Sequence, residues 1–261
     1  MANRVVLITG ASSGVGYALA LAYARRGDHV VVTARRRERL AELEQAVNAL
    51  PGHGELLLVT ADVTDRAAVQ SAVDQAVARW GRLDVIVANA GVGQRGTVVD
   101  SEWADLETLL RTNIDGVLHT IRAGVPALRR TGGGQIVIIS SVVSGMIAPY
   151  AAAYSASKAF VSSLARSLRL ELEADNIGVT DVLLGRVATE FSERRLGASG
   201  HAAKAPRLPV MTPEFVAEGI IRAVDQKQKR VVLRFFDWLI VLGNLLVPGF
   251  IGRRALRQYK T

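Results

Sequence analysis

Short apolar segments alternate with amphipathic helical segments along most of the 261 residues, and this alternation restricts the folds open to the chain. The first apolar run, residues 5–8, leads through a turn into a helix that Gly27 ends. Further strands are expected at residues 29–33, 56–60, 83–88, 135–139 and 178–184. Between them, Thr64 is the expected cap of a helix that runs to Trp80, and a long helix is expected from Ser101 to about Leu128. Runs that are apolar throughout are typical of strands buried on both faces. The pattern predicts a single-domain α/β fold, in which helices flank a doubly wound parallel sheet of about seven strands.

The first turn between strand and helix is rich in glycine and reads Thr9-Gly10-x-x-x-Gly14-x-Gly16. Glycines let the backbone turn tightly and approach a pyrophosphate, and the N-terminus of the following helix offers free N–H groups to that anion. This is the Rossmann-type arrangement for a dinucleotide. The residues expected to contact the cofactor here are Gly10, Ser12, Ser13, Gly14, Val15 and Gly16.

The same turn satisfies a second motif, because residues 10–14 also read Gly-x-Ser-x-Gly, the nucleophile elbow of α/β-hydrolases. A hydrolase would need an acidic residue and then a histidine later in the chain. The histidines of the chain are His29, His53, His119 and His201. None lies in a segment that resembles a catalytic loop after a late strand, with His201 as the one position left open. We therefore favour the dinucleotide interpretation.

Arginines follow the second strand, at the place where NAD-binding units usually carry an acidic residue for the ribose 2′-hydroxyl. Ala34 stands at that place, and Arg35 and Arg36 come next. A guanidinium group suits a 2′-phosphate, which a carboxylate would repel. The sequence thus predicts NADP(H) as cofactor, with Arg35 as the main phosphate ligand and Arg36 as the second. In the alternative interpretation, these arginines only begin the exposed face of the next helix.

Tyr154 and Lys158 are four residues apart in a stretch with helical apolar periodicity. Residues at this spacing share one face of a helix, so the phenol and the ammonium point to the same place. A free tyrosine titrates near ~10, and a cation held close to it lowers that pKa. Such a tyrosine can give a proton to a carbonyl oxygen or take one from an alcohol. Taken alone, the pair also fits two surface residues that only pack and solvate.

With these motifs in hand, residues 4–235 resemble the short-chain dehydrogenase/reductase family. Ser141 lies thirteen residues before Tyr154, as it does in that family. The positions that match its catalytic tetrad are Asn113, Ser141, Tyr154 and Lys158. The resemblance implies that Tyr154 is the general acid/base and that Lys158 lowers its pKa and holds the nicotinamide ribose. It further implies that Ser141 stabilises charge on the substrate oxygen, and that Asn113 holds a helix backbone and a water of a proton relay.

The resemblance also extends the cofactor site. It implies that Asp62 and Val63 contact the adenine, and that Asn89-Ala90-Gly91 steadies the central sheet beside the cofactor. After the sixth strand, it implies that Gly185, Val187 and Thr189 meet the nicotinamide. The family often has a proline before this glycine, and the present chain has Leu184 there, which loosens the turn. Tyr154 and Lys158 complete the set of expected cofactor contacts, and no metal is expected.

The later part of the chain suggests a boundary, with a catalytic domain at residues 1–235 and an extension at residues 236–261. A substrate lid is expected at about residues 190–211, where glycine, alanine, proline and charged residues gather. Thr212 and Pro213 then read as the cap and first residue of a new helix. The extension is apolar and basic, and too interrupted to span a bilayer. It could lie in a membrane interface with its arginines on anionic lipid, cover the substrate pocket, or pack on a second subunit.

Composition and charge restrict the partners, the chemistry and the cellular location expected for the chain. The net charge of +8 could favour nucleic acid or anionic lipid, but the arginines are scattered and no nucleic-acid recognition motif accompanies them. We therefore expect no nucleic-acid partner. The chain has no cysteine, which excludes disulfides and thiol chemistry. We expect no signal peptide, since residues 1–4 run directly into an apolar strand-like segment. The expected location is cytoplasmic, with a peripheral membrane contact through the tail as an alternative.

Taken together, the sequence predicts an NADP(H)-dependent oxidoreductase that interconverts a carbonyl and a secondary alcohol. The pocket is expected to be apolar, which predicts a hydrophobic ketone or aldehyde as substrate; its expected lining is Val142, Val143, Met146 and Ile147 together with the lid. Two alternatives remain, a 3-oxoacyl-thioester reductase of the same family and a non-catalytic protein that binds or senses NADPH. The resemblance implies a homodimer or homotetramer.

Overall fold

The computed structural model describes residues 3–197 and 210–257, in which seven parallel strands form one sheet. The strand order is β3-β2-β1-β4-β5-β6-β7. The strands are β1 (Val5–Thr9), β2 (His29–Ala34), β3 (Leu56–Thr60), β4 (Val85–Ala88), β5 (Gly134–Ser141), β6 (Ile177–Leu184) and β7 (Arg230–Val231). This arrangement confirms the doubly wound parallel α/β fold predicted from the sequence.

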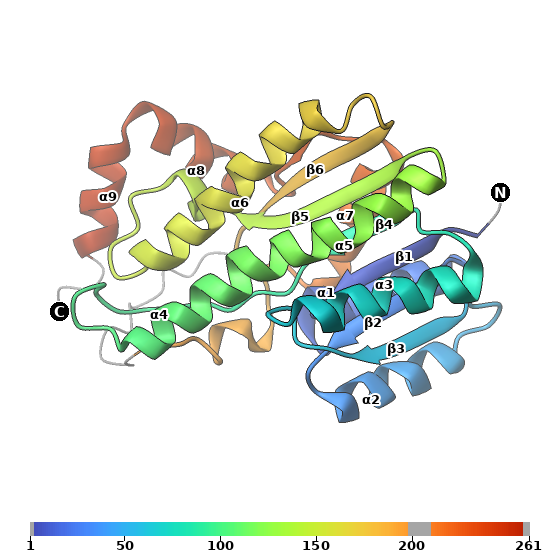
Figure 1. Ribbon diagram of the computed structural model, residues 1–261. Helices are drawn as coiled ribbons and strands as arrows, with labels where there is room; N and C mark the ends of the chain where they lie inside the picture. The colour runs from blue at the N-terminus through green and yellow to red at the C-terminus, as the bar shows by residue number, and fades with distance from the viewer. Residues whose placement is uncertain (1–2, 198–209, 258–261) are drawn as a thin grey trace.

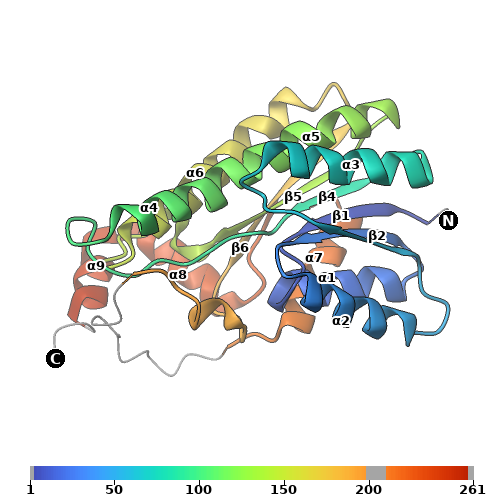
Figure 2. The same ribbon diagram turned by 60° about the horizontal axis from the view of Figure 1, so that its bottom comes forward.

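Helices cover both faces of the sheet (Figures 1 and 2). One face is covered by α1 (Gly14–Arg25), α2 (Arg37–Asn48) and α7 (Pro213–Asp225). The other is covered by α3 (Arg66–Trp80), α5 (Gly116–Arg130) and α6 (Ala152–Glu171), with α4 (Trp103–Leu110) leading into α5. Successive side chains of β1 alternate between two apolar clusters: Val6 and Ile8 in one, Val5 and Leu7 in the other. Burial on both faces explains why the strands are apolar at nearly every position.

The strand order reverses between β1 and β4, and the carboxyl ends of these strands form the crevice in which this class of sheet binds its ligands. Asn89, directly after β4, fixes the two strand ends to each other. Its side-chain amide donates to the carbonyl oxygens of Thr9 at 2.8 Å and Gly10 at 3.2 Å. The glycine-rich turn is therefore held at the centre of the sheet edge.

The long helix expected from Ser101 to about Leu128 is interrupted by a π-helical turn, η1 (Arg111–Asp115). This turn lies between α4 and α5 and contains the buried Asn113. A π turn inserts one extra residue into the helix, and such turns are frequent at functional sites. The apolar periodicity of the sequence does not report this insertion, because it changes the phase of the helix by a single residue.

Two helix starts predicted from the sequence can be compared with the structure. The expected cap Thr64 was wrong by one residue: Asp65 accepts from the backbone N–H groups of Ala67 and Ala68, and α3 begins at Arg66. Thr64 instead donates its hydroxyl to Asp62 at 2.9 Å. The cap expected at Thr212 is confirmed, since its hydroxyl accepts from the Phe215 N–H at 3.2 Å.

The C-terminal residues form two helices, α8 (Phe235–Leu246) and α9 (Pro248–Arg257), at the end of the molecule where the strands finish (Figure 1). Within the described residues, no helix by itself has the length and apolar character to cross a membrane; α8 and α9 meet that test only as a pair bent by 116°. The inner side of α8 packs against the short helix η2 (Val142–Gly145), and the Asn244 amide donates to the Gly145 carbonyl oxygen. The extension thus lies beside the expected substrate pocket.

Candidate active site

Tyr154 and Lys158 lie in the first two turns of α6, which begins at Ala152. Lys158 is only 4% exposed, and its ammonium donates to the carbonyl oxygen of Ile139 in β5 at 2.9 Å. The Tyr154 side chain keeps part of its surface exposed. The helix therefore carries both groups near its start and holds the ammonium against β5.

Asn113 fixes the loop after β4 to the start of α6. Its side-chain oxygen accepts from the Val92 N–H at 2.8 Å, and its amide donates to the Val92 carbonyl oxygen at 3.0 Å. The same amide donates to the Ser157 hydroxyl at 3.0 Å. The π turn η1, in which Asn113 is the buried residue, provides the backbone geometry for these contacts. Asn113 thus joins the elements that carry Gly91 and Lys158, and a Cβ on Gly91 would lie 3.2 Å from the Asn113 oxygen and 3.4 Å from the Lys158 nitrogen.

Ser141 ends β5 and lies opposite Leu184 of β6 in the register of the sheet. Its hydroxyl donates to the Leu184 carbonyl oxygen at 3.1 Å. A second interaction links Ser141 to the phenol of Tyr154, where it favours the ionised form. The position expected to carry proline thus takes part in the strand pairing that holds Ser141 in place.

The pKa of Tyr154 is raised above its ordinary value, because burial disfavours the phenolate more than the neighbouring groups favour it. The hydrogen bond with Ser141 and the charge of Arg195 both act in the lowering direction. The lowering of the Tyr154 pKa by Lys158 stays a prediction. The Lys158 ammonium is directed to the Ile139 carbonyl oxygen, and the charge of Arg195 also favours the phenolate of Tyr154.

Burial lowers the pKa of Lys158 to about 8, and the charge of Asp181 acts against this shift. Asp181 lies in β6, is 1% exposed, and accepts hydrogen bonds from the hydroxyls of Ser140 and Ser162, the latter at 2.6 Å. Burial also raises the pKa of Asp181, and the two hydroxyls oppose that effect. Sequence reasoning missed this residue, although a lone acid within an apolar strand was a usable signal.

The glycine turn has the shape needed for the cofactor, because side chains are excluded from it. A Cβ on Gly10 would lie 2.7 Å from the Ala90 Cα, and one on Gly14 would lie 2.9 Å from the Thr189 Cγ2. A Cβ on Gly16 would lie 2.5 Å from the Gly10 carbonyl oxygen. The backbone also leaves the usual region at Gly10 and Gly14, where φ is +70° and +59°. Ser13 and Val15 stand at the start of α1, whose N-terminal N–H groups suit a pyrophosphate.

Arg36 and Arg35 differ in their place relative to this turn. The Arg36 guanidinium donates to the Ser12 hydroxyl at 3.0 and 3.2 Å and to the Ser13 hydroxyl at 2.9 Å. Arg35 is largely exposed, with its guanidinium 3.7 Å from the Asp62 carboxylate. The geometry therefore brings Arg36, expected as the second phosphate ligand, closer to the glycine turn than Arg35.

The contacts of Arg36 also bear on the hydrolase interpretation. A nucleophilic Ser12 would need a histidine as base, yet its hydroxyl accepts from an arginine. His29 accepts from the Glu55 N–H, and His119 bonds to the Val63 carbonyl oxygen. His201 lies outside the described residues. Within residues 3–197 and 210–257, no histidine is hydrogen-bonded to Ser12.

The remaining expected contacts line the same edge. Asp62 accepts from the Thr64 N–H at 2.9 Å, which holds the turn after β3 beside the buried Val63. After β6, Val187 forms an isolated bridge with Met211 through the carbonyl of Arg186 and the N–H of Ala188, so its own backbone groups point away from Met211. A groove of about 670 Å³ runs here; the expected site residues in its lining are Ser13, Gly14, Val187 and Thr189.

Gly185 stands at the edge of the extension. A Cβ there would collide with the carboxylate of Asp237 in α8, which is 3% exposed and paired with Arg234 at 2.8 Å. The expected lid at about 190–211 is described only at its ends, residues 190–197 and 210–211. Its first residues contribute three side chains that sequence reasoning missed. Phe191 packs against Tyr154 with ring centroids 6.0 Å apart, Arg195 acts on the phenol, and Glu190 pairs with Arg36.

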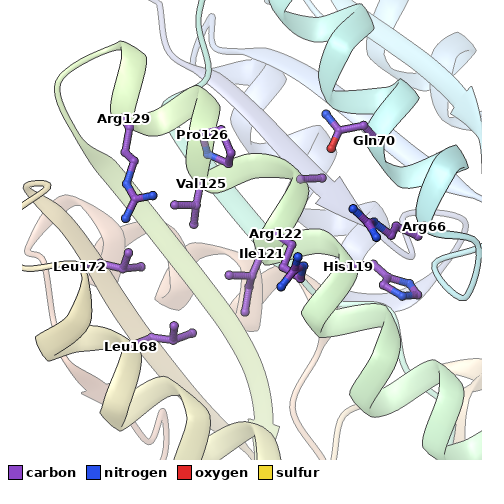
Figure 3. Close-up of a pocket in the computed structure, with 11 residues that line it drawn as sticks. Arg66, Gln70, His119, Ile121, Arg122, Val125, Pro126, Arg129, Leu168 and Leu172 are labelled. Carbon is purple, nitrogen blue, oxygen red and sulfur yellow. The ribbon is translucent and has the colours of Figure 1, made fainter.

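A separate hollow of about 280 Å³ lies on the α3–α5–α6 face, away from these residues (Figure 3). Arg66, His119 and Arg122 lie at one side of it, and Leu168 and Leu172 of α6 at the other. None of the expected catalytic or cofactor residues lines this hollow. It is therefore a surface feature distinct from the candidate active site.

Comparison with known proteins gives the family. The sequence profile described as short chain dehydrogenase matches residues 4–198. The dehydrogenase/reductase SDR family member 7B of Xenopus laevis is 32% identical over 268 residues, covering 98% of this chain and 83% of that protein. A glycine betaine reductase of Emericella nidulans is 34% identical over 234 residues, which cover 87% of this chain but only 18% of that protein.

Solved structures agree with these matches. An alcohol dehydrogenase from Thermococcus sibiricus, complexed with 5-hydroxy-NADP, superposes with a TM-score of 0.75 at 28% identity, covering 87% of this chain and 93% of that one. A short chain dehydrogenase/reductase from Burkholderia phymatum, in complex with NAD, superposes with a TM-score of 0.84 at 25% identity, covering 94% and 93%. The chain therefore belongs to the short-chain dehydrogenase/reductase family of oxidoreductases.

Proposed function

We propose that this protein is an NADP(H)-dependent oxidoreductase that interconverts a carbonyl and a secondary alcohol. The observation that carries the proposal is the arrangement of Tyr154, Ser141 and Lys158 at the edge of the sheet. The phenol interacts with Ser141, and Lys158 lies one turn further along α6, against β5. A protein that only binds or senses the cofactor would not require this set of proton-handling groups.

In the direction of reduction, Tyr154 gives the proton of its hydroxyl to the substrate oxygen. The Ser141 hydroxyl donates to the same oxygen and stabilises the charge that develops there. Lys158 holds the nicotinamide ribose, and Asn113 orders a water through which the proton on Tyr154 is replaced. The nicotinamide cofactor supplies or accepts the hydride when bound. Oxidation of an alcohol uses the same groups in reverse.

Arg36 supports the choice of NADP(H) over NAD(H), because its guanidinium lies over the Ser12 and Ser13 hydroxyls of the glycine turn. A planar guanidinium binds a phosphate with two hydrogen bonds. We infer that Arg36 is the main ligand of the 2′-phosphate and that Arg35 contributes from the surface. In binding titrations, Arg36→Ala should weaken NADP⁺ by about tenfold or more and NAD⁺ by much less. Equal losses for both would contradict this assignment.

The substrate is inferred to be a hydrophobic ketone or aldehyde, since Phe191 packs against Tyr154 and the short helix η2 contacts α6, which carries Tyr154. A 3-oxoacyl thioester is the nearest alternative within the family. A panel of hydrophobic ketones, aldehydes and acyl thioesters, assayed with NADPH and with NADH, separates these possibilities. Turnover of a simple ketone supports the first; turnover restricted to acyl thioesters supports the second. Binding of NADPH without turnover of any compound would favour a non-catalytic role.

A second inference concerns residues 236–261, which we regard as an extension that contacts an anionic membrane surface. Helix α8 buries the polar Asp237 and Asn244, while several of its large apolar side chains are exposed, Phe235 at 74% and Leu245 at 76%. An exposed apolar surface of this kind favours a membrane or a partner. The exposed residues of α8 and the α8–α9 corner are Phe235, Phe236, Trp238, Leu239, Leu245, Leu246, Val247 and Phe250.

Charge favours the membrane over a second copy of the chain. Arg253, Arg254 and Arg257 are exposed on α9, and residues 238–257 contain no acidic residue. A symmetric dimer through this surface would place it against itself and bring the arginines together without partners. Anionic lipid complements both the apolar and the basic part.

Sedimentation with vesicles tests this inference. The wild-type chain should sediment with phosphatidylserine-containing vesicles and less with phosphatidylcholine alone, and Trp238→Ser should reduce the effect. Val99→Ser, at an exposed apolar position outside the extension, is the control. Absence of sedimentation in both lipids would contradict the membrane contact. Concentration-dependent association that Trp238→Ser abolishes would instead identify a second copy as the partner.

The expected homodimer or homotetramer remains a separate proposal. It is supported by the exposed face of α6 that carries the apolar Leu170. Light scattering after gel filtration would measure the mass, and Leu170→Asp should lower it if this face is the interface. A monomeric mass for the wild-type chain would contradict the proposal.

A further inference from the structure

Glu190 stands at the start of η3 (Glu190–Ser192), directly after the residues expected to meet the nicotinamide. Its carboxylate pairs with three arginines. One oxygen lies 3.0 Å from Arg36 and 3.1 Å from Arg194, and the other lies 3.3 Å from Arg39. Two of these arginines, Arg36 and Arg39, belong to the start of α2, 154 and 151 residues away in the chain. The carboxylate therefore reaches across from one side of the cofactor groove to the other.

The position of Arg36 makes this contact relevant to the cofactor. The same guanidinium that pairs with Glu190 also donates to Ser12 and Ser13 of the glycine turn. Arg39, one turn further along α2, supplies the second guanidinium that faces the carboxylate. Two guanidinium groups converge on one anionic group beside the glycine turn. This is the donor set that a 2′-phosphate would need.

A carboxylate and a phosphate monoester compete for such a donor set, because both accept two parallel hydrogen bonds from a guanidinium group. The hydrogen bond from Arg36 lowers the pKa of Glu190, so its side chain stays ionised at neutral pH. Arg39 has a second acidic neighbour, Glu42 at 2.8 Å, whereas the hydroxyls of Ser12 and Ser13 are the other partners of Arg36.

We infer that Glu190 is a specificity-determining residue that occupies the 2′-phosphate ligands Arg36 and Arg39 and competes with NADP(H) for them. The inference rests on the proposed NADP(H) specificity. It goes further because it assigns to Glu190 an effect that opposes the binding of the 2′-phosphate by Arg36 and Arg39. NADP(H) has to displace Glu190 from both arginines. NAD(H) carries a 2′-hydroxyl and has no such requirement. Glu190 therefore lowers the affinity for NADP(H) relative to the affinity for NAD(H).

Calorimetric titration of the full chain with NADP⁺ and with NAD⁺ tests this inference without any need for turnover. Glu190→Gln keeps the shape of the side chain and removes its charge. We expect this variant to bind NADP⁺ about three- to tenfold more tightly, the range expected for loss of partly exposed ion pairs, and to bind NAD⁺ nearly unchanged. Adenosine 2′,5′-bisphosphate should follow NADP⁺, since it carries the 2′-phosphate without the nicotinamide.

Glu171→Gln is the matched control. Glu171 is exposed at the end of α6, lies outside the lining of the cofactor groove and loses the same charge. It should leave both affinities within about twofold, because a distant exposed charge is screened by salt. Equal tightening by both variants would show a general effect of net charge and overturn the competition. Weaker binding of NADP⁺ by Glu190→Gln would overturn it as well, since Glu190 would then hold Arg36 in its binding position.

Arg36→Ala separates this inference from the proposed function. If that variant loses NADP⁺ selectively while Glu190→Gln changes nothing, the 2′-phosphate assignment holds and the competition is wrong. If Arg36→Ala weakens NADP⁺ no more than NAD⁺, both the assignment and the inference built on it are wrong. Glu190→Ala should shift NADP⁺ affinity in the same direction as Glu190→Gln, which guards against an effect of the introduced amide.

Discussion

The ammonium of Lys158 donates to the carbonyl oxygen of Ile139 at 2.9 Å, so protein contacts alone anchor the lysine to the end of β5. The group is buried and lies one helical turn from Tyr154. The ammonium is therefore fixed in position, but burial removes water from around it. This loss of hydration disfavours the charged form and lowers the pKa of Lys158 to about 8. Lys158 consequently titrates within the pH range in which the enzyme can be assayed.

This titration predicts the pH dependence of catalysis. If the ammonium form holds the cofactor ribose, kcat/KM for NADPH should fall tenfold per pH unit above about pH 8, because Lys158 loses its proton there. A profile measured with a fixed substrate, in buffers of constant ionic strength, checks this. A profile that stays flat for two units above that pKa would contradict the assigned role of Lys158.

The same shift has a consequence for stability. The pKa of Lys158 is about 8 in the folded protein and 10.5 in the reference state, so the unfolded chain binds more protons between these values. Stability rises with pH wherever the unfolded chain binds more protons. The contribution of Lys158 to the free energy of unfolding should therefore increase from about pH 8 to pH 10.5. Denaturant titrations of the wild-type chain and Lys158→Met across this window measure it; parallel curves would contradict it.

Asp181 should influence Lys158 without touching the substrate. The charge of Asp181 raises the pKa of Lys158. Arg230 and Arg169 are charged groups that act on Asp181 and lower its pKa. Asp181→Asn removes the charge, so the high-pH limb of the kcat/KM profile should move to lower pH. Ser162→Ala, which removes one hydrogen-bond donor to Asp181 but keeps the charge, should move the limb much less. A limb that stays in place in Asp181→Asn would exclude electrostatic coupling between the two residues.

Gly16 should tolerate no side chain, since a Cβ would lie 2.5 Å from the Gly10 carbonyl oxygen and 2.6 Å from the Asn89 amide nitrogen. Gly16→Ala should lower the free energy of unfolding by about 1–3 kcal/mol, the range for overpacked sites, and weaken cofactor binding. Urea unfolding measures the first effect. Gly145→Ala is the control, because a Cβ there has its nearest neighbour at 3.9 Å. Equal stability losses in both variants would contradict the packing argument.

Much of the fold could be predicted because the signals are local. The strand at residues 56–60 and the cap at Thr212 depend on neighbouring residues in the sequence, and both match the structure. The expected site residues also gather at one edge, since the ends of parallel strands meet there. The π turn at Asn113 could not be predicted in this way. Its extra residue is stabilised by contacts to Val92 and Ser157, which are distant in the sequence.

The parts of the site that sequence reasoning missed depend on burial or on long-range contacts. The pKa direction of Tyr154 is decided by desolvation, which spacing along a helix does not report. The pairing of Arg36 with Glu190 joins segments 154 residues apart. The orientation of α8 was also hidden, because its apolar composition suggests burial while Asp237 and Asn244 are the residues it buries.

The central claim is that Tyr154 transfers the proton, and one comparison tests it most directly. Oxidation of NADPH by a hydrophobic ketone is followed through the loss of absorbance of the reduced nicotinamide, in the wild type, Tyr154→Phe and Tyr23→Phe. Tyr23 is a fair control, because its buried hydroxyl has no hydrogen-bond partner within the described structure. We expect Tyr154→Phe to lose about 10²–10⁴-fold in kcat while NADPH binding stays within about twofold, and Tyr23→Phe to retain activity. Undiminished turnover by Tyr154→Phe would contradict the account.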